Sequence, residues 1–239
     1  MDKINITHHI SQQFNVELED LRNDVLAMGG LVEQQILDAL HALNTSNSEL
    51  AEIVITNDYK VNALEVAIDE ECSRILARRQ PTASDLRLIV AIIKTITDLE
   101  RIGDEAEKVA QMTAHRATLN DPNRNLESIN HMGTTVRMMV HDALDAFARL
   151  DTEQAIEVVK RDAKVDKEYE AISRELITFM MEDPRSITPS LDILWSARAL
   201  ERVGDHARNI CEYVIYLVRG KDVRHTSLEQ MEQTVRQPQ

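Results

Sequence analysis

The sequence predicts an all-α fold made of two tandem, pseudo-symmetric three-helix bundles, with six long antiparallel helices. Aromatic residues make up only 3% of the 239 residues, and glycine and proline occur 6 and 5 times. This composition favours helices and argues against an all-β sandwich. In addition, the segment LERIGDEA at residues 99–106 returns as LERVGDHA at residues 200–207, at an offset of 101. The chain therefore contains one half-length unit twice.

The first two helices of the first half are separated by a polar turn. Apolar residues three or four positions apart run through residues 16–43, which is typical of a long amphipathic helix. The polar segment 44–47 interrupts this pattern, and Ser46 and Glu49 have capping-box spacing. Apolar spacing resumes over residues 50–75, so we expect a second helix there.

A third helix is expected from about residue 85 to about residue 117. It follows the turn RQPTAS, in which the last residue, Ser84, is a suitable N-cap. The turn-forming segment NDPN at residues 120–123 then indicates the boundary between the two halves of the chain.

The second half repeats the pattern of the first. Residues of the first two helices return at an offset of 104: Met28 and Gly29 as Met132 and Gly133, and Asp58, Lys60 and Val61 as Asp162, Lys164 and Val165. The offset falls to 101 at the LERxGD segments, so the second half lacks three residues in its second turn. We therefore assign residues 1–120 to the first three-helix repeat and residues 121–239 to the second.

The last helix has clear sequence signals at both ends. Thr188 followed by Pro189 predicts its N-cap and first position, and Gly220 predicts its end. Helices of roughly 25 to 35 residues with short turns pack as antiparallel neighbours. Because long helices in a three-helix unit leave an apolar flank, we expect the two bundles to pack on each other and the protein to form a homodimer.

Charge and hydropathy exclude several classes of partner. The formal net charge is −14, with 27 Lys and Arg against 41 Asp and Glu, so we expect no nucleic-acid partner. The apolar run at residues 88–93 is far shorter than the ~18 residues of a membrane span. Residues 1–6 lack the pattern of a signal peptide. We expect no direct membrane insertion, a cytoplasmic location, and buried free thiols at Cys72 and Cys211.

Each copy of the repeated segment carries two acidic residues four positions apart. These pairs are Glu100 with Asp104 and Glu201 with Asp205, and on a helix each pair lies one turn apart on one face. In the first copy this face is rotated away from the apolar stripe, so core packing does not explain it. Gly103 costs a helix interior about 1 kcal/mol relative to alanine. Its position suggests that another group approaches the backbone closely there.

The second helix of each half carries a matching polar pair, Asp58 with Asn62 and Asp162 with Asp166. In the first half, the pair on the second helix and the pair on the third helix are at similar distances in sequence from the turn near Pro81 that joins these helices. At a rise of ~1.5 Å per residue, the two pairs therefore lie within about one helical turn of each other along the bundle axis. In the second half the match is looser. Four oxygen-bearing side chains can thus converge on one flank of each bundle.

Carboxylates gathered in this way repel each other unless a cation neutralises them. Ligands that are all oxygen favour hard ions such as Mg²⁺, Mn²⁺, Ca²⁺ or ferric iron, and zinc if His206 or a water molecule completes the set. The sequence therefore favours metal binding at the duplicated motifs. The alternative is that these acidic residues face solvent and bind nothing.

Several motifs closely resemble the PhoU family: the duplicated Glu-Arg-Ile/Val-Gly-Asp segments, QPTASDLRL at residues 80–88, and Met28-Gly29-Gly30. The resemblance extends from residue 9 to residue 225. It implies two three-helix bundles and a negative regulator of the phosphate-starvation response that modulates high-affinity phosphate uptake. It also implies contacts with the ATPase subunit of the phosphate ABC transporter and with a sensor histidine kinase, and hence peripheral association with inner-membrane partners.

The resemblance also implies metal ions, with iron, manganese, magnesium or zinc as candidates. By position, the E/D-x-x-x-D metal motifs of the family correspond here to Glu100/Asp104, Glu201/Asp205 and Asp162/Asp166. The chain departs from the family pattern at Asn62, where an amide replaces the acid. One charge fewer should weaken the first site or change its metal preference.

A metal-dependent enzyme, similar to a phosphoesterase and using the same carboxylates, is the alternative function. Catalysis by a metal ion requires an open coordination position and a cleft that excludes water. The flank of a helical bundle gives little shelter from water. The sequence therefore favours a regulator without catalytic activity.

Overall fold

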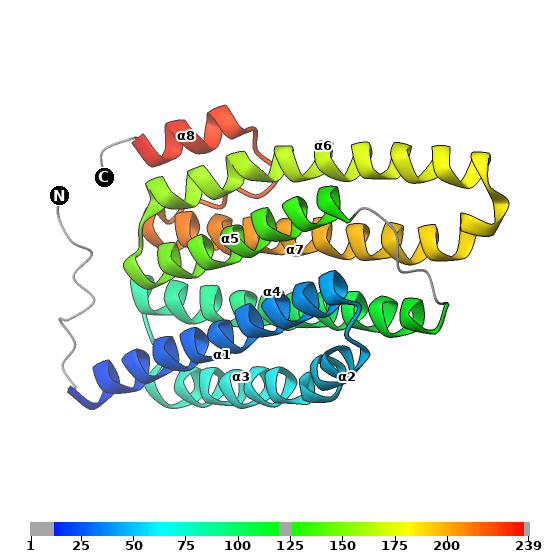
Figure 1. Cartoon of the computed structure of the whole chain (residues 1–239). Coiled ribbons are helices and arrows are strands. Elements are labelled where there is room, and N and C mark those ends of the chain that lie inside the picture. Colours follow the sequence, from blue (N-terminus) through cyan, green and yellow to red (C-terminus); the bar gives the residue numbers. More distant parts are fainter. Residues whose placement is uncertain (1–11, 120–125, 237–239) are drawn as a thin grey trace.

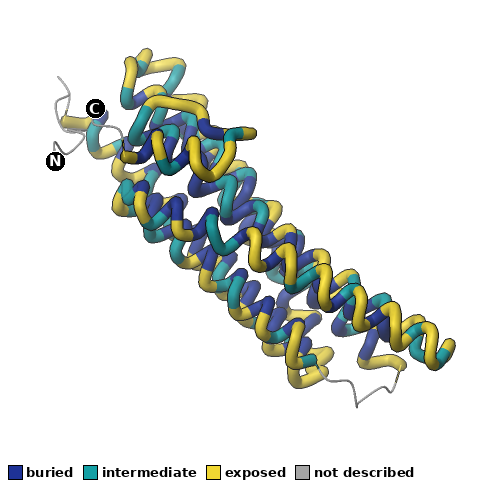
Figure 2. The backbone as a smooth tube through the Cα atoms, turned by 90° about the horizontal axis from the view of Figure 1, so that it is seen from above, coloured by how far each residue is buried: buried dark blue, intermediate teal, exposed yellow. Residues whose placement is uncertain are grey.

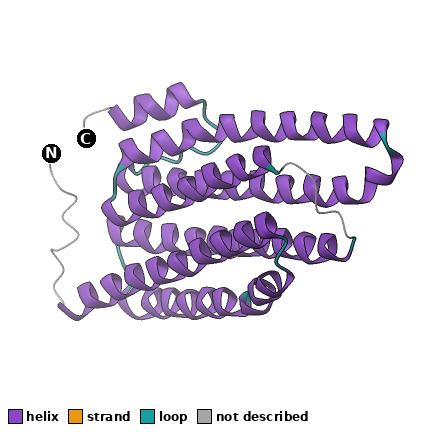
Figure 3. Ribbon diagram, viewed as in Figure 1, coloured by secondary structure: helices purple, strands orange, loops and turns teal. Residues whose placement is uncertain are grey.

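The computed structural model describes residues 12–119 and 126–236, which form long helices joined by short turns (Figure 1). No strand occurs among these described residues (Figure 3). The prediction of an all-α fold is confirmed. The sequence signals at residues 1–6 and 120–123 lie outside the described residues.

The first half forms a bundle in which the second of the three expected helices is divided in two. Its helices are α1 (Gln12–Thr45), α2 (Ser48–Asn57), α3 (Tyr59–Arg79) and α4 (Ala83–Thr118). Apolar residues at helical spacing form the buried face of each helix, as the amphipathic pattern predicts. Asn47 caps α2 because its side chain accepts a hydrogen bond from the Leu50 amide at 3.0 Å.

The second half forms an equivalent bundle of α5 (Glu127–Arg149), α6 (Thr152–Glu182) and α7 (Ile187–Arg219). A short 3₁₀ turn, η1 (Pro184–Ser186), connects α6 to α7, and α8 (Leu228–Arg236) packs mainly on α6 (Figure 1). Gly220 ends α7 as predicted. It adopts a left-handed conformation with φ of 69°, and its N–H donates to the Tyr216 carbonyl at 2.8 Å.

The two bundles pack along each other. The main contact joins α4 to α7, and a second contact joins α1 to α5. Buried residues lie between the helices, whereas exposed residues cover the outer faces (Figure 2). One apolar core runs through both bundles, so the expected packing of bundle on bundle is confirmed.

The largest difference from the predicted helices is a break in the second one. Instead of a single helix through residues 50–75, α2 ends at Asn57 and α3 begins at Tyr59, with Asp58 between them. The buried apolar residues keep helical spacing across the break. The apolar pattern therefore gives no sign of it.

Three predicted caps are wrong by one or two residues. The residue after Ser46 caps α2, Thr82 rather than Ser84 precedes α4, and α7 begins before Thr188. Ser46 itself has a positive φ of 51° in the turn between α1 and α2. Such small shifts are expected, because sequence signals place helix ends only to within a residue or two.

Both cysteines are buried and free, as predicted. Burial raises the pKa of the Cys72 thiol to about 12 and that of the Cys211 thiol well above its usual range. Both thiols therefore stay protonated and unreactive at neutral pH. Among residues 12–119 and 126–236, we find no helix with an apolar stretch sufficient to span a bilayer.

Candidate metal centre

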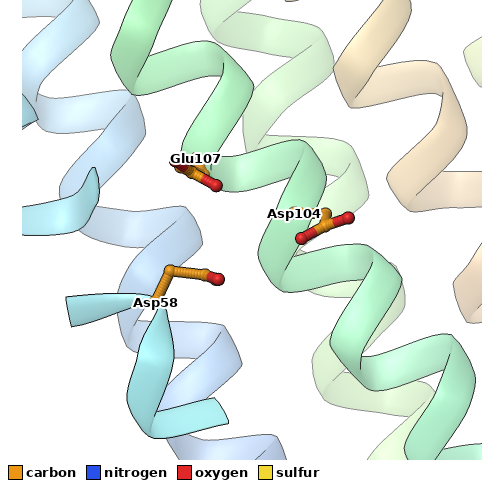
Figure 4. Close-up of side chains that lie close together, drawn as sticks. All are labelled: Asp58, Asp104 and Glu107. Carbon is orange, nitrogen blue, oxygen red and sulfur yellow. The ribbon is translucent and has the colours of Figure 1, made fainter. Parts of the chain in front are cut away.

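Three carboxylates converge where the α2–α3 break faces α4. Asp58 at the break and Asp104 and Glu107 on α4 each place one oxygen within 4.8 Å of the others (Figure 4). We call these three residues the first cluster. The structure brings Asp58 and Asp104 together, as the antiparallel register predicts, and adds Glu107.

Amide groups on two helices orient the carboxylate of Asp58. This side chain does not cap α3, although it stands at the start of that helix. Instead, its Oδ1 accepts a hydrogen bond from Nε2 of Gln35 on α1 at 3.2 Å, and its Oδ2 accepts one from Nδ2 of Asn62 at 2.9 Å. Asn62, the predicted partner of Asp58, therefore holds that carboxylate in place.

Gly103 lets α4 approach this carboxylate closely. A Cβ atom at Gly103 would lie 3.2 Å from Oδ1 of Asp58 and 3.1 Å from Oε1 of Gln35, which is tighter than most side-chain contacts. The expectation that another group approaches the backbone at Gly103 is confirmed. The approaching groups are Asp58 and the residue that orients it.

The carboxylates of the first cluster disfavour joint ionisation. Burial raises the pKa of Asp104, and the charge of Asp58 raises it further. Burial likewise raises the pKa of Glu107, and both Asp58 and Asp104 add to this effect. Glu100, one turn before Asp104, also has a raised pKa, from burial first and from Asp104 second. A cation among these groups would remove their mutual repulsion.

Two buried oxygen atoms beside the first cluster have no hydrogen-bond partner in the described part of the chain. They are Oε1 of Gln35, a residue that is only 7% exposed, and Oδ1 of Asn62. Together with three carboxylates they form the all-oxygen donor set that hard cations select. The residues present therefore fit a hard divalent or ferric ion.

The second half carries the predicted carboxylates Asp162 and Asp166 on α6 and Glu201 and Asp205 on α7, and we call these four residues the second cluster. They are near enough to influence one another's ionisation, but within the described residues no three of them bring their oxygens within 4.8 Å of one another, as the first cluster does. Burial raises the pKa of Asp162, Glu201 and Asp205, and neighbouring carboxylates raise each one further. A Cβ atom at Gly204 would lie 3.6 Å from Oδ1 of Asp162, an ordinary contact distance. The approach of Asp162 to the backbone of α7 is therefore looser than that of Asp58 to α4 at Gly103.

His206, a candidate ligand of the second cluster, lies at the interface between the bundles. Its Nδ1 is 2.7 Å from Oδ1 of Asp98 on α4, and the same oxygen accepts a hydrogen bond from Asn209 at 3.1 Å. This ring nitrogen is therefore engaged with α4, not with the carboxylates of α6 and α7.

Sequence reasoning missed Glu107. It follows Asp104 by three positions, so both side chains lie on the same face of α4, and this spacing is the signal that identifies it. The comparison of the two halves hides Glu107, because its counterpart at an offset of 101 is Arg208.

The fold and the site define a class of all-helical proteins in which two repeated three-helix bundles each gather acidic side chains on one flank. The family model described as the PhoU domain matches the chain twice, over residues 25–113 and 129–214. The chain belongs to the PhoU family.

Relatives are similar to the chain over nearly their whole length. The phosphate-specific transport system accessory protein PhoU homolog of Pseudomonas aeruginosa is 55% identical over 235 residues, which are 98% of this chain and 97% of the relative. The phosphate-specific transport system accessory protein PhoU of Escherichia coli K12 is 50% identical over 232 residues, which are 97% of this chain and 96% of the relative.

Solved structures show the same fold. The crystal structure of PhoU from Pseudomonas aeruginosa has a TM-score of 0.85 at 56% identity, covering 87% of this chain and 100% of that one. The phosphate transport system regulatory protein PhoU from Streptococcus pneumoniae has a TM-score of 0.82 at 34% identity, covering 88% and 99%. The predicted fold class is thus confirmed by comparison as well.

Proposed function

We propose that this protein is an accessory protein of a phosphate transport system and a negative regulator of the phosphate-starvation response. The observation that carries the proposal is the identity of 50% and 55%, over almost the full length, to relatives named as phosphate-specific transport system accessory proteins. The similarity covers both bundles and not one shared module. By this proposal, the protein restrains phosphate uptake and the starvation response when phosphate is plentiful.

The proposed partners are the ATPase subunit of the phosphate ABC transporter and the sensor histidine kinase, met at the cytoplasmic face of the inner membrane. The adjoining helices α1 and α5 offer a first surface to examine, because Leu37 and Met138 are 44% and 50% exposed there. Homodimer formation stays a prediction, which sedimentation velocity measurements would test.

We further propose that the first cluster binds a hard metal ion, with manganese, magnesium and iron ahead of zinc. Asp58, Asp104 and Glu107 would hold the ion, and the unpaired Oδ1 of Asn62 supports the same role for that residue. The bound ion supplies the positive charge that offsets the repulsion between the carboxylates. It would also fasten the α2–α3 break to α4, so metal loading and the shape of this flank would be coupled.

The metal ion is proposed to act in structure and regulation, without catalysis. The relatives are named as accessory or regulatory proteins. The alternative, a phosphoesterase, predicts Mn²⁺-dependent hydrolysis of p-nitrophenyl phosphate that Asp104→Asn abolishes. Turnover of this kind would overturn the assignment as a regulator, whereas hydrolysis equal in the two proteins would reflect contamination.

Deletion of the gene followed by complementation tests the regulatory role. In phosphate-rich medium, we expect the deletion to raise expression of an alkaline phosphatase reporter several-fold and the wild-type gene to restore repression. Asp104→Asn should restore it only in part. The matched control is Asp20→Asn, which alters an exposed residue of α1 and should repress fully. Reporter expression unaffected by the deletion contradicts the proposal.

A further inference from the structure

The two halves of the chain carry opposite charges at one position beside the carboxylates. At an offset of 101, Glu107 of the first cluster corresponds to Arg208 on α7. Glu107 adds a third carboxylate beside Asp58 and Asp104. Arg208 adds a guanidinium instead, and its Nη1 donates to Oδ2 of Asp162, the counterpart of Asp58, at 3.1 Å.

Arg208 is held between two buried carboxylates. Asp162 is 4% exposed and Glu212 is 5% exposed. While Nη1 of Arg208 bonds to Asp162, its Nε donates to Oε1 of Glu212 at 3.2 Å. A guanidinium stays charged at any physiological pH, and hydrogen bonds between opposite charges are the strong ones. The chain itself therefore supplies a fixed cation to the second cluster.

A second arginine acts in the same direction. Nη1 of Arg198 forms an ion pair with Oε1 of Glu201 in the second cluster. The counterpart of Arg198 in the first half is Thr97, whose uncharged hydroxyl donates to a backbone carbonyl of its own helix. Lys108, which directly follows Glu107, forms its ion pair with Glu105. Its positive charge acts on Asp104 and Glu107 without an ion pair to either, and in both it lowers the pKa less than burial raises it.

The residue that orients the central carboxylate also differs between the halves. Gln35 donates to Asp58 in the first half, but its counterpart at an offset of 104 is Met139. The Cε atom of Met139 packs near Gly204 as Gln35 packs near the equivalent glycine. Methionine has no donor to offer, and within the described residues the buried Oδ1 of Asp162 has no hydrogen-bond partner. The other oxygen of this carboxylate, Oδ2, accepts from Arg208.

We propose that Arg208 takes the place of a metal ion in the second cluster, so that the chain has a single metal centre at the first cluster. The inference rests on the proposed metal binding at the first cluster, where the unpaired Oε1 of the buried Gln35 accompanies the three carboxylates. An ion entering the second cluster would meet a fixed positive charge. It would also have to separate Asp162 and Glu212 from Arg208, and buried charges that lose their partner are strongly destabilising.

Manganese binding to the full-length chain tests this inference. Metal-stripped protein is dialysed against Mn²⁺, and the bound ion per chain is measured by ICP-MS. We expect the wild-type protein to bind Mn²⁺. The Asp104→Asn variant should bind none, and the Asp205→Asn variant should bind as much as the wild type. Equal losses in the two variants overturn the assignment of Arg208 while the first cluster remains a metal site. A wild-type chain that binds no Mn²⁺ overturns both proposals.

Exchange of the two deciding residues provides the converse test. Arg208→Glu gives the second cluster the carboxylate that Glu107 gives the first, and it should double the bound Mn²⁺, a gain that Asp205→Asn reverses. Glu107→Arg should remove the Mn²⁺ of the first cluster. Arg208→Gln removes the charge but keeps a hydrogen-bond donor to Asp162, so this variant is less disruptive to the fold than Arg208→Glu. It should also bind more Mn²⁺ than the wild type. Folded Arg208 variants that bind no more Mn²⁺ than wild type overturn the inference.

Discussion

Gly29 on α1 lies against Leu144 on α5, so closely that a Cβ atom on this glycine would be 2.6 Å from Cδ2 of the leucine. Gly133 on α5 meets Leu40 on α1 in the same way. Gly133 is the counterpart of Gly29, and Leu144 is the counterpart of Leu40, at an offset of 104. In each contact, the glycine of one half therefore meets the equivalent leucine of the other half. Reciprocal contacts of this kind characterise two-fold interfaces, so a pseudo-two-fold axis passes between α1 and α5.

Adding one methyl group to this contact should separate the halves slightly. We expect Gly29→Ala to destabilise the fold by about 1–3 kcal/mol, the usual cost of extra volume in a packed interior. Gly30→Ala is the matched control, because a Cβ atom there meets nothing within 4 Å. It should stabilise the helix by roughly 0.5–1 kcal/mol. Urea unfolding followed by circular dichroism measures both changes, and effects of the same sign would contradict the close contact.

Asp98 joins the two bundles through buried hydrogen bonds. It is 2% exposed and lies against both His206 and Asn209 of α7. Asp98→Ala leaves these groups unpaired in the interior, so we expect a loss of about 2–4 kcal/mol in the free energy of unfolding. Glu157→Ala, which removes an exposed ion pair with Lys160, should cost less than ~1 kcal/mol. Similar losses in the two variants, measured by urea unfolding, would show that water replaces the buried partner.

The meeting of Asp58 and Asp104 was predictable because the rise per residue is constant within a helix, so two positions equally far from a turn lie at the same level. The break at Asp58 was not, because the apolar spacing continues through it. The place of Glu107 in the first cluster was not predicted for a different reason. Only residues that recur in both halves stand out by repetition, and the counterpart of Glu107 is an arginine.

Side-chain contacts between different helices also could not be predicted from the sequence. Arg208 on α7 pairs with Asp162 on the preceding helix α6, and His206 on α7 pairs with Asp98 on α4 in the other half of the chain. Each of these side chains could pair with several others nearby in sequence. The choice depends on how α7 is rotated against α6 and α4, which a single sequence does not specify. The periodicity of the sequence predicts where the helices lie and which residues stand at the same height along the bundle. Which side chains pair across an interface depends on how the helices pack.

Raised carboxyl pKa values should make the metal-free first cluster sensitive to pH. For Asp104 and Glu107, burial first and neighbouring carboxylates second hold the pKa above its ordinary value in the folded chain. Above about pH 4 the folded chain therefore keeps protons that the unfolded chain has lost. The stabilising contribution of the cluster is thus largest at low pH and declines as pH rises through the raised pKa values.

Thermal unfolding of EDTA-treated protein across this pH range measures the effect. We expect Asp104→Asn to flatten the decline, because the amide cannot ionise. Asp20→Asn changes an exposed aspartate away from the cluster and should leave the profile as in wild type. Parallel profiles for both variants would show that the cluster does not govern the pH dependence. Saturating Mn²⁺ should also reduce the decline in wild type, since the ion stabilises the ionised carboxylates.

Gln35 should control metal affinity through both ends of its amide group, because its Nε2 donates to Asp58 at 3.2 Å and its unpaired Oε1 belongs to the oxygen donor set. Gln35→Met copies the counterpart residue Met139 and removes the donor, so we expect Mn²⁺ affinity to fall about 10–100-fold, as when other orienting partners of metal ligands are lost. Gln34→Met makes the same change at an exposed position, where the amide donates to Asp38 at 2.8 Å. Isothermal titration with Mn²⁺ gives both Kd values. An unchanged Kd in Gln35→Met would mean that Asn62 alone orients Asp58 and that the metal centre does not depend on α1.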